Sequence, residues 1–129
     1  MSTAGIRRTA TIRWTAPAPL MAWLVAGGLV TQAYLAGLGV FGTEGFALHS
    51  VFGWVLALPI LGLALHSWFY PAGRRFRGPA SLLLALYLLQ VVLVVAGMGA
   101  GLAWLSALHP ANALMMLGVT LEVLRRARA

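Results

Sequence analysis

Apolar residues dominate this chain in four long runs, at about residues 20–40, 47–69, 80–102 and 108–124. Each run is close to the ~20 residues that an α-helix needs to cross about 30 Å of hydrocarbon. None of the runs alternates apolar and polar residues, as the strands of a membrane barrel do. The pattern therefore predicts four membrane-spanning helices, of which the fourth is the shortest. The first run exceeds the apolar region of a typical signal peptide, so we interpret it as a retained span.

The connections between these runs are short, which makes consecutive helices antiparallel neighbours. The expected fold is all-α: an integral membrane four-helix bundle of up-down-up-down topology. Within it we expect a cytoplasmic N-terminal segment at residues 1–19, the transmembrane bundle at 20–125 and a cytoplasmic tail at 126–129. The connection "PAGRRFRGP" between the second and third runs is predicted to be a turn bounded by proline and glycine.

Composition supports a membrane protein, because 61% of the residues are hydrophobic and only 9% are charged, against about 25% charged in soluble domains. The net charge of +7 comes from arginines in three clusters that border apolar runs: Arg7, Arg8, Arg13; Arg74, Arg75, Arg77; Arg125, Arg126, Arg128. This placement is typical of anchors at the bilayer surface and not of nucleic-acid binding. The positive-inside rule predicts that both termini and the arginine-rich connection at 74–77 are cytoplasmic.

Residues 36–49, "AGLGVFGTEGFALH", align without a gap with residues 96–109, "AGMGAGLAWLSALH", and six of the fourteen positions are identical. The alignment superimposes one helical hairpin on the other, so the bundle is predicted to consist of two similar hairpins related by a pseudo-twofold axis. His49 and His109 occupy the same place in the two copies. Both begin a span that starts on the outer side, so we expect them at one depth. His66 lies about 25 Å deeper along its helix.

Histidine inside a membrane span is a candidate functional residue that usually faces the bundle interior. Two neutral imidazoles on facing helices suit axial ligation of haem iron, so His49 and His109 are the predicted metal ligands. The second ring N–H of each is expected to donate to a carbonyl one turn earlier on its own helix or in a loop. Glycines near the same level are predicted to let the porphyrin approach the backbone: Gly37, Gly39, Gly97, Gly99 and Gly101.

Other interpretations stay open for each of these residues. A histidine near a helix end also bonds loops or lipid headgroups, and glycines in membrane helices often mediate helix packing. A zinc or copper site would have only the two histidines and Glu44, which is few ligands. His66 is expected at the cytoplasmic interface, with quinone contact or an intersubunit ligand as alternatives, and Gln32 and Gln90 are expected to hydrogen-bond between helices. The chain has no cysteine, which excludes disulfides, iron–sulfur clusters and thioether-attached haem within it.

The histidine at the head of the second span, together with Gln90, Gly97 and "ALH" at 107–109, resembles one four-helix half of a haem A synthase. The resemblance is partial, and it implies haem b with His49 and His109 as axial ligands on the outer side. Glu44 would then correspond to an acidic residue that this family has before its second helix. The segments "AYLAGLGVFG" and "ALHPANALMMLG" are also similar to a family of short, uncharacterised four-span bacterial membrane proteins. This resemblance implies a location in the inner (plasma) membrane of a bacterial cell.

These observations predict a small membrane cytochrome b that binds one haem b. Because bis-histidine ligation leaves no open position on iron, the expected role is electron transfer between a quinol or partner protein and another redox centre. Two alternatives remain: a cofactor-free accessory subunit that packs against a larger respiratory or redox membrane complex, or an enzyme that modifies haem. Whether the chain is an enzyme is therefore left open by the sequence.

Overall fold

The computed structural model describes residues 17–42 and 45–129. It consists of α1 (Pro17–Phe41), α2 (Ala47–Val55), α3 (Ala57–Phe69), a 3₁₀ helix η1 (Pro71–Phe76), α4 (Arg77–Gly99) and α5 (Ala103–Arg128). The described residues form four spans that are long and apolar enough to cross a membrane, α2 and α3 together making the second. The prediction of an all-α, four-helix membrane bundle is confirmed. Arg7, Arg8, Arg13, Thr43 and Glu44 lie outside the described residues.

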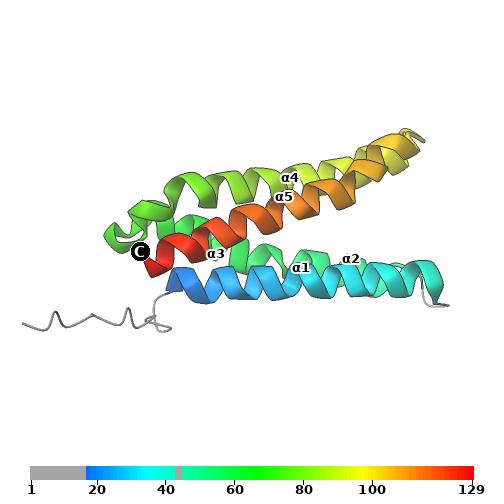
Figure 1. Ribbon diagram of the computed structural model, residues 1–129. Helices are drawn as coiled ribbons and strands as arrows, with labels where there is room; N and C mark the ends of the chain where they lie inside the picture. The colour runs from blue at the N-terminus through cyan, green and yellow to red at the C-terminus, as the bar shows by residue number, and fades with distance from the viewer. Residues whose placement is uncertain (1–16, 43–44) are drawn as a thin grey trace, which may run out of the picture.

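The four spans form a ring in which each span packs against two others. α1 packs against α3 and α5, and α4 packs against the same two helices. Figure 1 shows α4 and α5 running side by side and diverging from α1 and α2 toward the end that carries the α4–α5 turn. The C-terminus, the start of α1 and η1 lie together at the opposite end. The chain is therefore an up-down-up-down bundle of two hairpins that are closed at one end and splayed at the other.

The second span is broken near its middle, although a single continuous helix was expected at 47–69. α2 ends at Val55, and α3 starts at Ala57. Pro59 explains the break, because it has no N–H to donate to the carbonyl of Val55 and its ring crowds the preceding turn. Leu56 keeps helical dihedral angles, φ −65° and ψ −20°, so the chain continues in nearly the same direction.

Two further boundaries differ from the prediction. The fourth span is not the shortest, because α5 has 26 residues and begins at Ala103; His109 therefore lies in its second turn. The arginine-rich connection 71–79 is helical and not an open turn. Its first part is η1, which has Pro71 at its start, and α4 follows it directly. Proline at the first position of a helix lacks only an N–H that would be unpaired in any case.

The buried core lies almost entirely in the closed half of the bundle. In α1 the buried residues all lie between Ala18 and Gly28, and none of the nine residues of α2, all of which are described, is buried. The largest buried side chains include Phe76, Ile60, Leu63, Leu83, Met116 and Val123. Many apolar side chains elsewhere on the four spans are exposed, as expected of a multi-pass protein whose surface contacts lipid. The protein is well packed at the arginine end and loosely packed at the histidine end.

Candidate functional site

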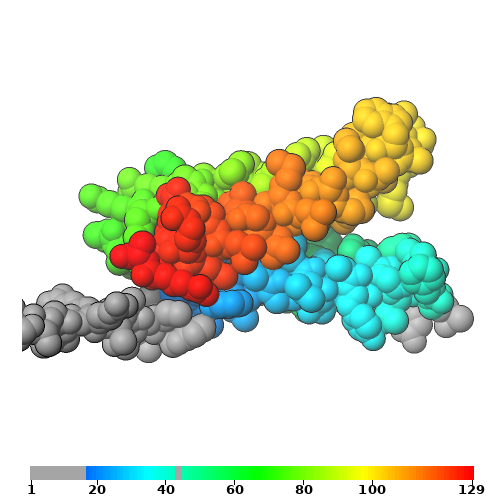
Figure 2. All heavy atoms as spheres, in the orientation of Figure 1, coloured from blue at the N-terminus to red at the C-terminus, as the bar shows by residue number. Residues whose placement is uncertain are grey.

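A cavity of about 560 Å³ lies between the two hairpins in the splayed half, and all four spans contribute to its wall. Figure 2 shows the same hollow between the cyan helices and the yellow and orange ones. Its volume is within the about 300–1,000 Å³ that is common for cofactor sites. The described residues that line it are mostly apolar, none of them is charged, and the polar ones include Gln32, His49, Ser50, Tyr87, Gln90 and His109.

His49 on α2 and His109 on α5 face each other in this cavity. Their ring centroids are 5.9 Å apart, and the ring planes are inclined at 59°. Both side chains are half-buried. The pairing of the two histidines, which the internal repeat predicted, is therefore present in the structure, and their rings come from opposite hairpins.

Each histidine is held by the carbonyl of a glutamine on the preceding span. Nδ1 of His49 is 3.1 Å from the backbone oxygen of Gln32, and Nδ1 of His109 is 3.4 Å from the backbone oxygen of Gln90. A carbonyl oxygen only accepts hydrogen bonds, so Nδ1 of each ring carries the proton and donates it. The lone pair of each neutral imidazole is then on Nε2, the nitrogen available for a metal ion or a proton.

The expectation that these N–H groups bond a carbonyl on their own helix or in a loop was wrong. Both acceptors belong to the antiparallel neighbour within the same hairpin, α1 for His49 and α4 for His109. The two hairpins therefore repeat a complete unit: a glutamine carbonyl on the first helix orients a histidine on the second. Sequence reasoning identified these glutamines as interhelical partners but missed this role, because it is played by backbone atoms that every residue has.

The Gln90 side chain makes the second hairpin more rigid. Its Nε2 donates to the backbone oxygen of His109 at 3.0 Å, and its Oε1 accepts from Nδ2 of Asn112. Asn112 is only 4% exposed and also donates to the Leu86 carbonyl at 2.8 Å. Sequence reasoning did not single out Asn112, although an amide inside a membrane span is a signal of an interhelical hydrogen bond. In the first hairpin, Oε1 of Gln32 is buried and has no partner within the described residues.

None of the five glycines predicted to contact a haem is among the described residues that line the cavity. Three of them have roles in the chain's own packing. A Cβ at Gly39 would lie 2.8 Å from the Phe46 ring, and one at Gly97 would lie 2.8 Å from the Ser106 backbone nitrogen, so both allow close approach within a hairpin. Gly101 has φ +66° in the α4–α5 turn. A Cβ at Gly37 or Gly99 would have no neighbour within 4 Å.

The hydrogen bonds around Gly101 are those of a Schellman motif at the end of α4. Leu102 N–H donates to the Gly97 carbonyl at 2.8 Å, and Gly101 N–H donates to the Met98 carbonyl at 3.4 Å. The left-handed conformation of Gly101 that this motif needs is easily adopted only by glycine. Contact of these glycines with a cofactor stays a prediction. The structure does show the packing role of Gly39 and Gly97 and the turn role of Gly101.

We expect Gly97→Ala to lower the free energy of unfolding by about 1–3 kcal/mol, because the new methyl group would overlap Ser106. Gly99→Ala is the matched control, since it makes the same change two residues later in open space. The measurement is the thermal midpoint of the purified protein in detergent. Equal effects of the two changes would mean that Gly97 is not a packing residue.

The other candidate ligands lie apart from this pair or outside the described residues. His66 is on α3, where its ring stacks on Tyr70 at 5.4 Å, and it does not line the cavity. Within residues 17–42 and 45–129, no three histidine or carboxylate side chains gather as a metal site. Two histidines are fewer than the three or four protein ligands of a zinc centre. Two facing imidazoles in an apolar cavity remain as the candidate site.

Among curated proteins and among solved structures, none matches this chain. One family model does, and it matches residues 32–97, just over half of the chain. The matched segment includes Gln32, His49 and Gln90 and ends before His109. The chain belongs to DUF6220, a family of unknown function.

Proposed function

We propose that this protein is a small membrane cytochrome b that holds one haem b between its two hairpins, with His49 and His109 as axial ligands. The observation that carries the proposal is the facing pair of imidazoles in an apolar cavity. Two imidazoles that ligate one metal ion from opposite sides, each through a nitrogen about 2 Å from it, have ring centres about 6 Å apart. The separation of 5.9 Å agrees with that arrangement.

The residues around the pair fit this group in two further respects. Both rings have Nδ1 bonded to a carbonyl, which fixes the tautomer that presents Nε2 as a ligand. The splayed half of the bundle also supplies an apolar cavity between the hairpins, in a part of the fold where few of the chain's own side chains are buried. Since no charged residue is among the described lining residues, we expect the propionates at the aqueous edge of the cavity.

The chemistry that haem b supplies when bound by two histidines is reversible one-electron transfer, because iron has no free position for oxygen. This chain's residues would hold the iron in a fixed, low-dielectric environment. Gln32 and Gln90 orient the imidazoles through their carbonyls, and the valines and leucines of the wall exclude water. The electron donor would be a quinol or a partner protein, and the acceptor another redox centre.

The distribution of arginine supports an orientation for this protein. Six arginines of the described residues lie at the closed end, in the α3–α4 connection and at the end of α5. By the positive-inside rule this end faces the cytoplasm. The proposed location is the inner membrane of a bacterium, as the resemblance to short bacterial four-span proteins implies. The haem would then lie in the outer half of the bilayer.

A visible absorption spectrum of the detergent-purified protein, oxidised and reduced, tests the proposal. We expect a Soret band, split α and β bands on reduction, and one haem b per chain by conversion to the pyridine haemochrome. A low-spin ferric signal in electron paramagnetic resonance would indicate two strong axial ligands. A colourless protein that copurifies within a larger membrane complex would contradict the proposal and favour the accessory-subunit alternative.

A further inference from the structure

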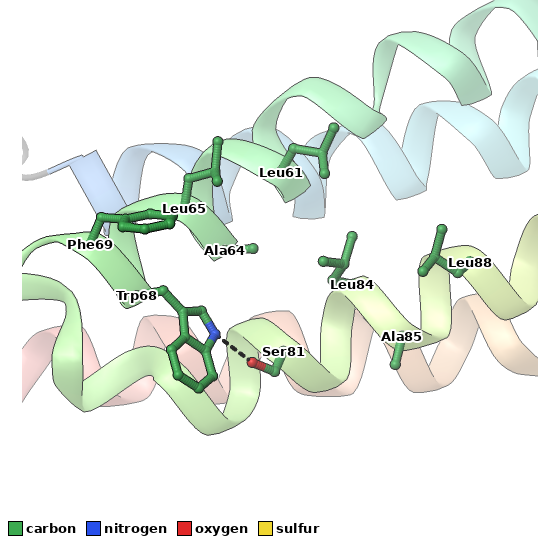
Figure 3. A pocket seen from close by; sticks show the side chains of 9 residues that line it. All are labelled: Leu61, Ala64, Leu65, Trp68, Phe69, Ser81, Leu84, Ala85 and Leu88. Atoms are coloured by element: carbon green, nitrogen blue, oxygen red, sulfur yellow. Dashed lines mark hydrogen bonds between the residues drawn. The ribbon is translucent and has the colours of Figure 1, made fainter.

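A groove of about 430 Å³ lies on the surface of the closed half of the bundle, between α3 and α4. Figure 3 shows Leu61, Leu65 and Phe69 of α3 on one side and Leu84, Ala85 and Leu88 of α4 on the other. From Trp68 to Leu61 along α3 the groove extends about 10 Å at the helical rise. This is a large part of the about 15 Å of hydrocarbon in one leaflet. The groove therefore has the length and the apolar walls that a lipid acyl chain needs.

The polar atoms of this groove are already paired with each other. Nε1 of Trp68 donates to Oγ of Ser81 at 2.9 Å, as drawn in Figure 3. No other polar side chain is among the described residues that line it. A quinone ring needs donors for its carbonyl oxygens, and this groove offers none that is free. The chemistry of the walls favours a hydrocarbon chain.

A positive charge, that of Arg77, lies at the cytoplasmic mouth of the groove. The guanidinium carbon of Arg77 lies 5.0 Å from the centre of the Trp68 ring. Its Nε and Nη2 donate to the carbonyls of Ser67 and Trp68, which holds the cation in place and leaves Nη1 directed to no described partner. Arg74 and Arg75 precede it on η1. The acidic side chain at this end, Glu122, pairs with Arg125 and Arg126 on α5, so Arg77 has no ion-pair partner among the described residues.

We propose that this groove is a binding site for an anionic phospholipid. One acyl chain would lie between α3 and α4, and the phosphate would lie beside Arg77 at the mouth. A zwitterionic lipid would bring a cationic group close to the same arginine, so the site should prefer phosphatidylglycerol to phosphatidylcholine. This site is separate from the cavity lined by His49 and His109, which lies in the splayed half of the bundle.

The test is quenching of Trp68 fluorescence by lipids with brominated acyl chains. Delipidated protein in detergent is titrated with dibrominated phosphatidylglycerol or phosphatidylcholine, and the Trp68 signal is the difference between the native protein and Trp68→Phe. One arginine near a surface favours an anionic lipid by about fivefold, so we expect phosphatidylglycerol to quench at a concentration at least about fivefold lower. Equal quenching curves for the two lipids would overturn the proposal.

Two pairs of variants separate the headgroup from the chain. Arg77→Gln should remove the preference for phosphatidylglycerol, whereas Arg128→Gln, which removes the same charge from the end of α5, should keep most of it. Ala85→Phe should fill the groove and abolish quenching by both lipids, whereas Ala107→Phe, at an exposed position on α5, should not. Unchanged quenching in Ala85→Phe, or displacement of the lipid by a soluble quinone, would overturn the proposal. These outcomes do not depend on whether haem is bound.

Discussion

If the protein binds haem b as proposed, His49→Ala and His109→Ala should each lose at least about nine-tenths of it, because the remaining single ligand would hold iron at one face only. The rings face each other at 5.9 Å from opposite hairpins, and neither α2 nor α5 has a second histidine. The measurement is the ratio of Soret to protein absorbance after purification. Any haem that remains should have a high-spin spectrum, since iron would be five-coordinate.

His66→Ala is the matched control for these two variants. It removes the same side chain from the same bundle, but His66 stacks on Tyr70 at the closed end and does not line the cavity. We expect its haem content and spectrum to equal those of the native protein. A native low-spin spectrum in either His49→Ala or His109→Ala would rule out bis-histidine ligation by this pair. Equal haem loss in all three variants would indicate a general loss of folding.

The spans and the histidine pair could be predicted from the sequence because both depend on long-range features of the pattern. A helix that crosses the bilayer needs about 20 consecutive apolar residues, and local detail of the sequence changes this requirement little. The repeat placed His49 and His109 at equivalent positions of two hairpins, and a pseudo-twofold arrangement then brought them together. The ion pairs of Glu122 with Arg125 and Arg126 can also be predicted from the sequence, since residues three and four apart on a helix are neighbours.

The parts that the sequence did not predict depend on the backbone or on single contacts. The carbonyls of Gln32 and Gln90 orient the histidines, and no residue type marks a carbonyl for that role. Glycines near the histidine level suggested contact with a flat ligand, yet the same absence of a side chain lets Gly97 pack against Ser106. The break at Leu56 had a visible cause in Pro59, but proline is tolerated inside membrane helices often enough that its effect needed the structure.

The contrast between the two halves of the bundle connects fold and function. Buried apolar side chains hold the four spans together near the arginines, whereas the hairpins separate around the histidines. A hydrogen bond joins the hairpins at the inner limit of the cavity, where the Tyr87 hydroxyl on α4 donates to the Gly53 carbonyl on α2 at 3.1 Å. A ligand between the hairpins would then complete the packing of the open half, so its binding should also stabilise the fold.

The closed half depends on η1, and Gly73→Ala should therefore be strongly destabilising, by about 3 kcal/mol. A Cβ at Gly73 would overlap the backbone oxygen of His66 and lie 2.7 Å from the Cα of Ser67. These are backbone atoms of α3, which cannot move aside as a flexible side chain does. The buried Phe76 and the Arg77 bonds to the end of α3 would be displaced as well.

Gly118→Ala makes the same change inside α5, where a Cβ would meet no atom of another part of the chain within 4 Å. Alanine has the higher helix propensity, so this control should be neutral or more stable by up to about 1 kcal/mol. Thermal unfolding in detergent, followed by circular dichroism, should place the midpoint of Gly73→Ala on the order of 10 °C below that of Gly118→Ala. If the two midpoints agree, η1 does not pack against α3 as described, and the closed half must be held together by its helices alone.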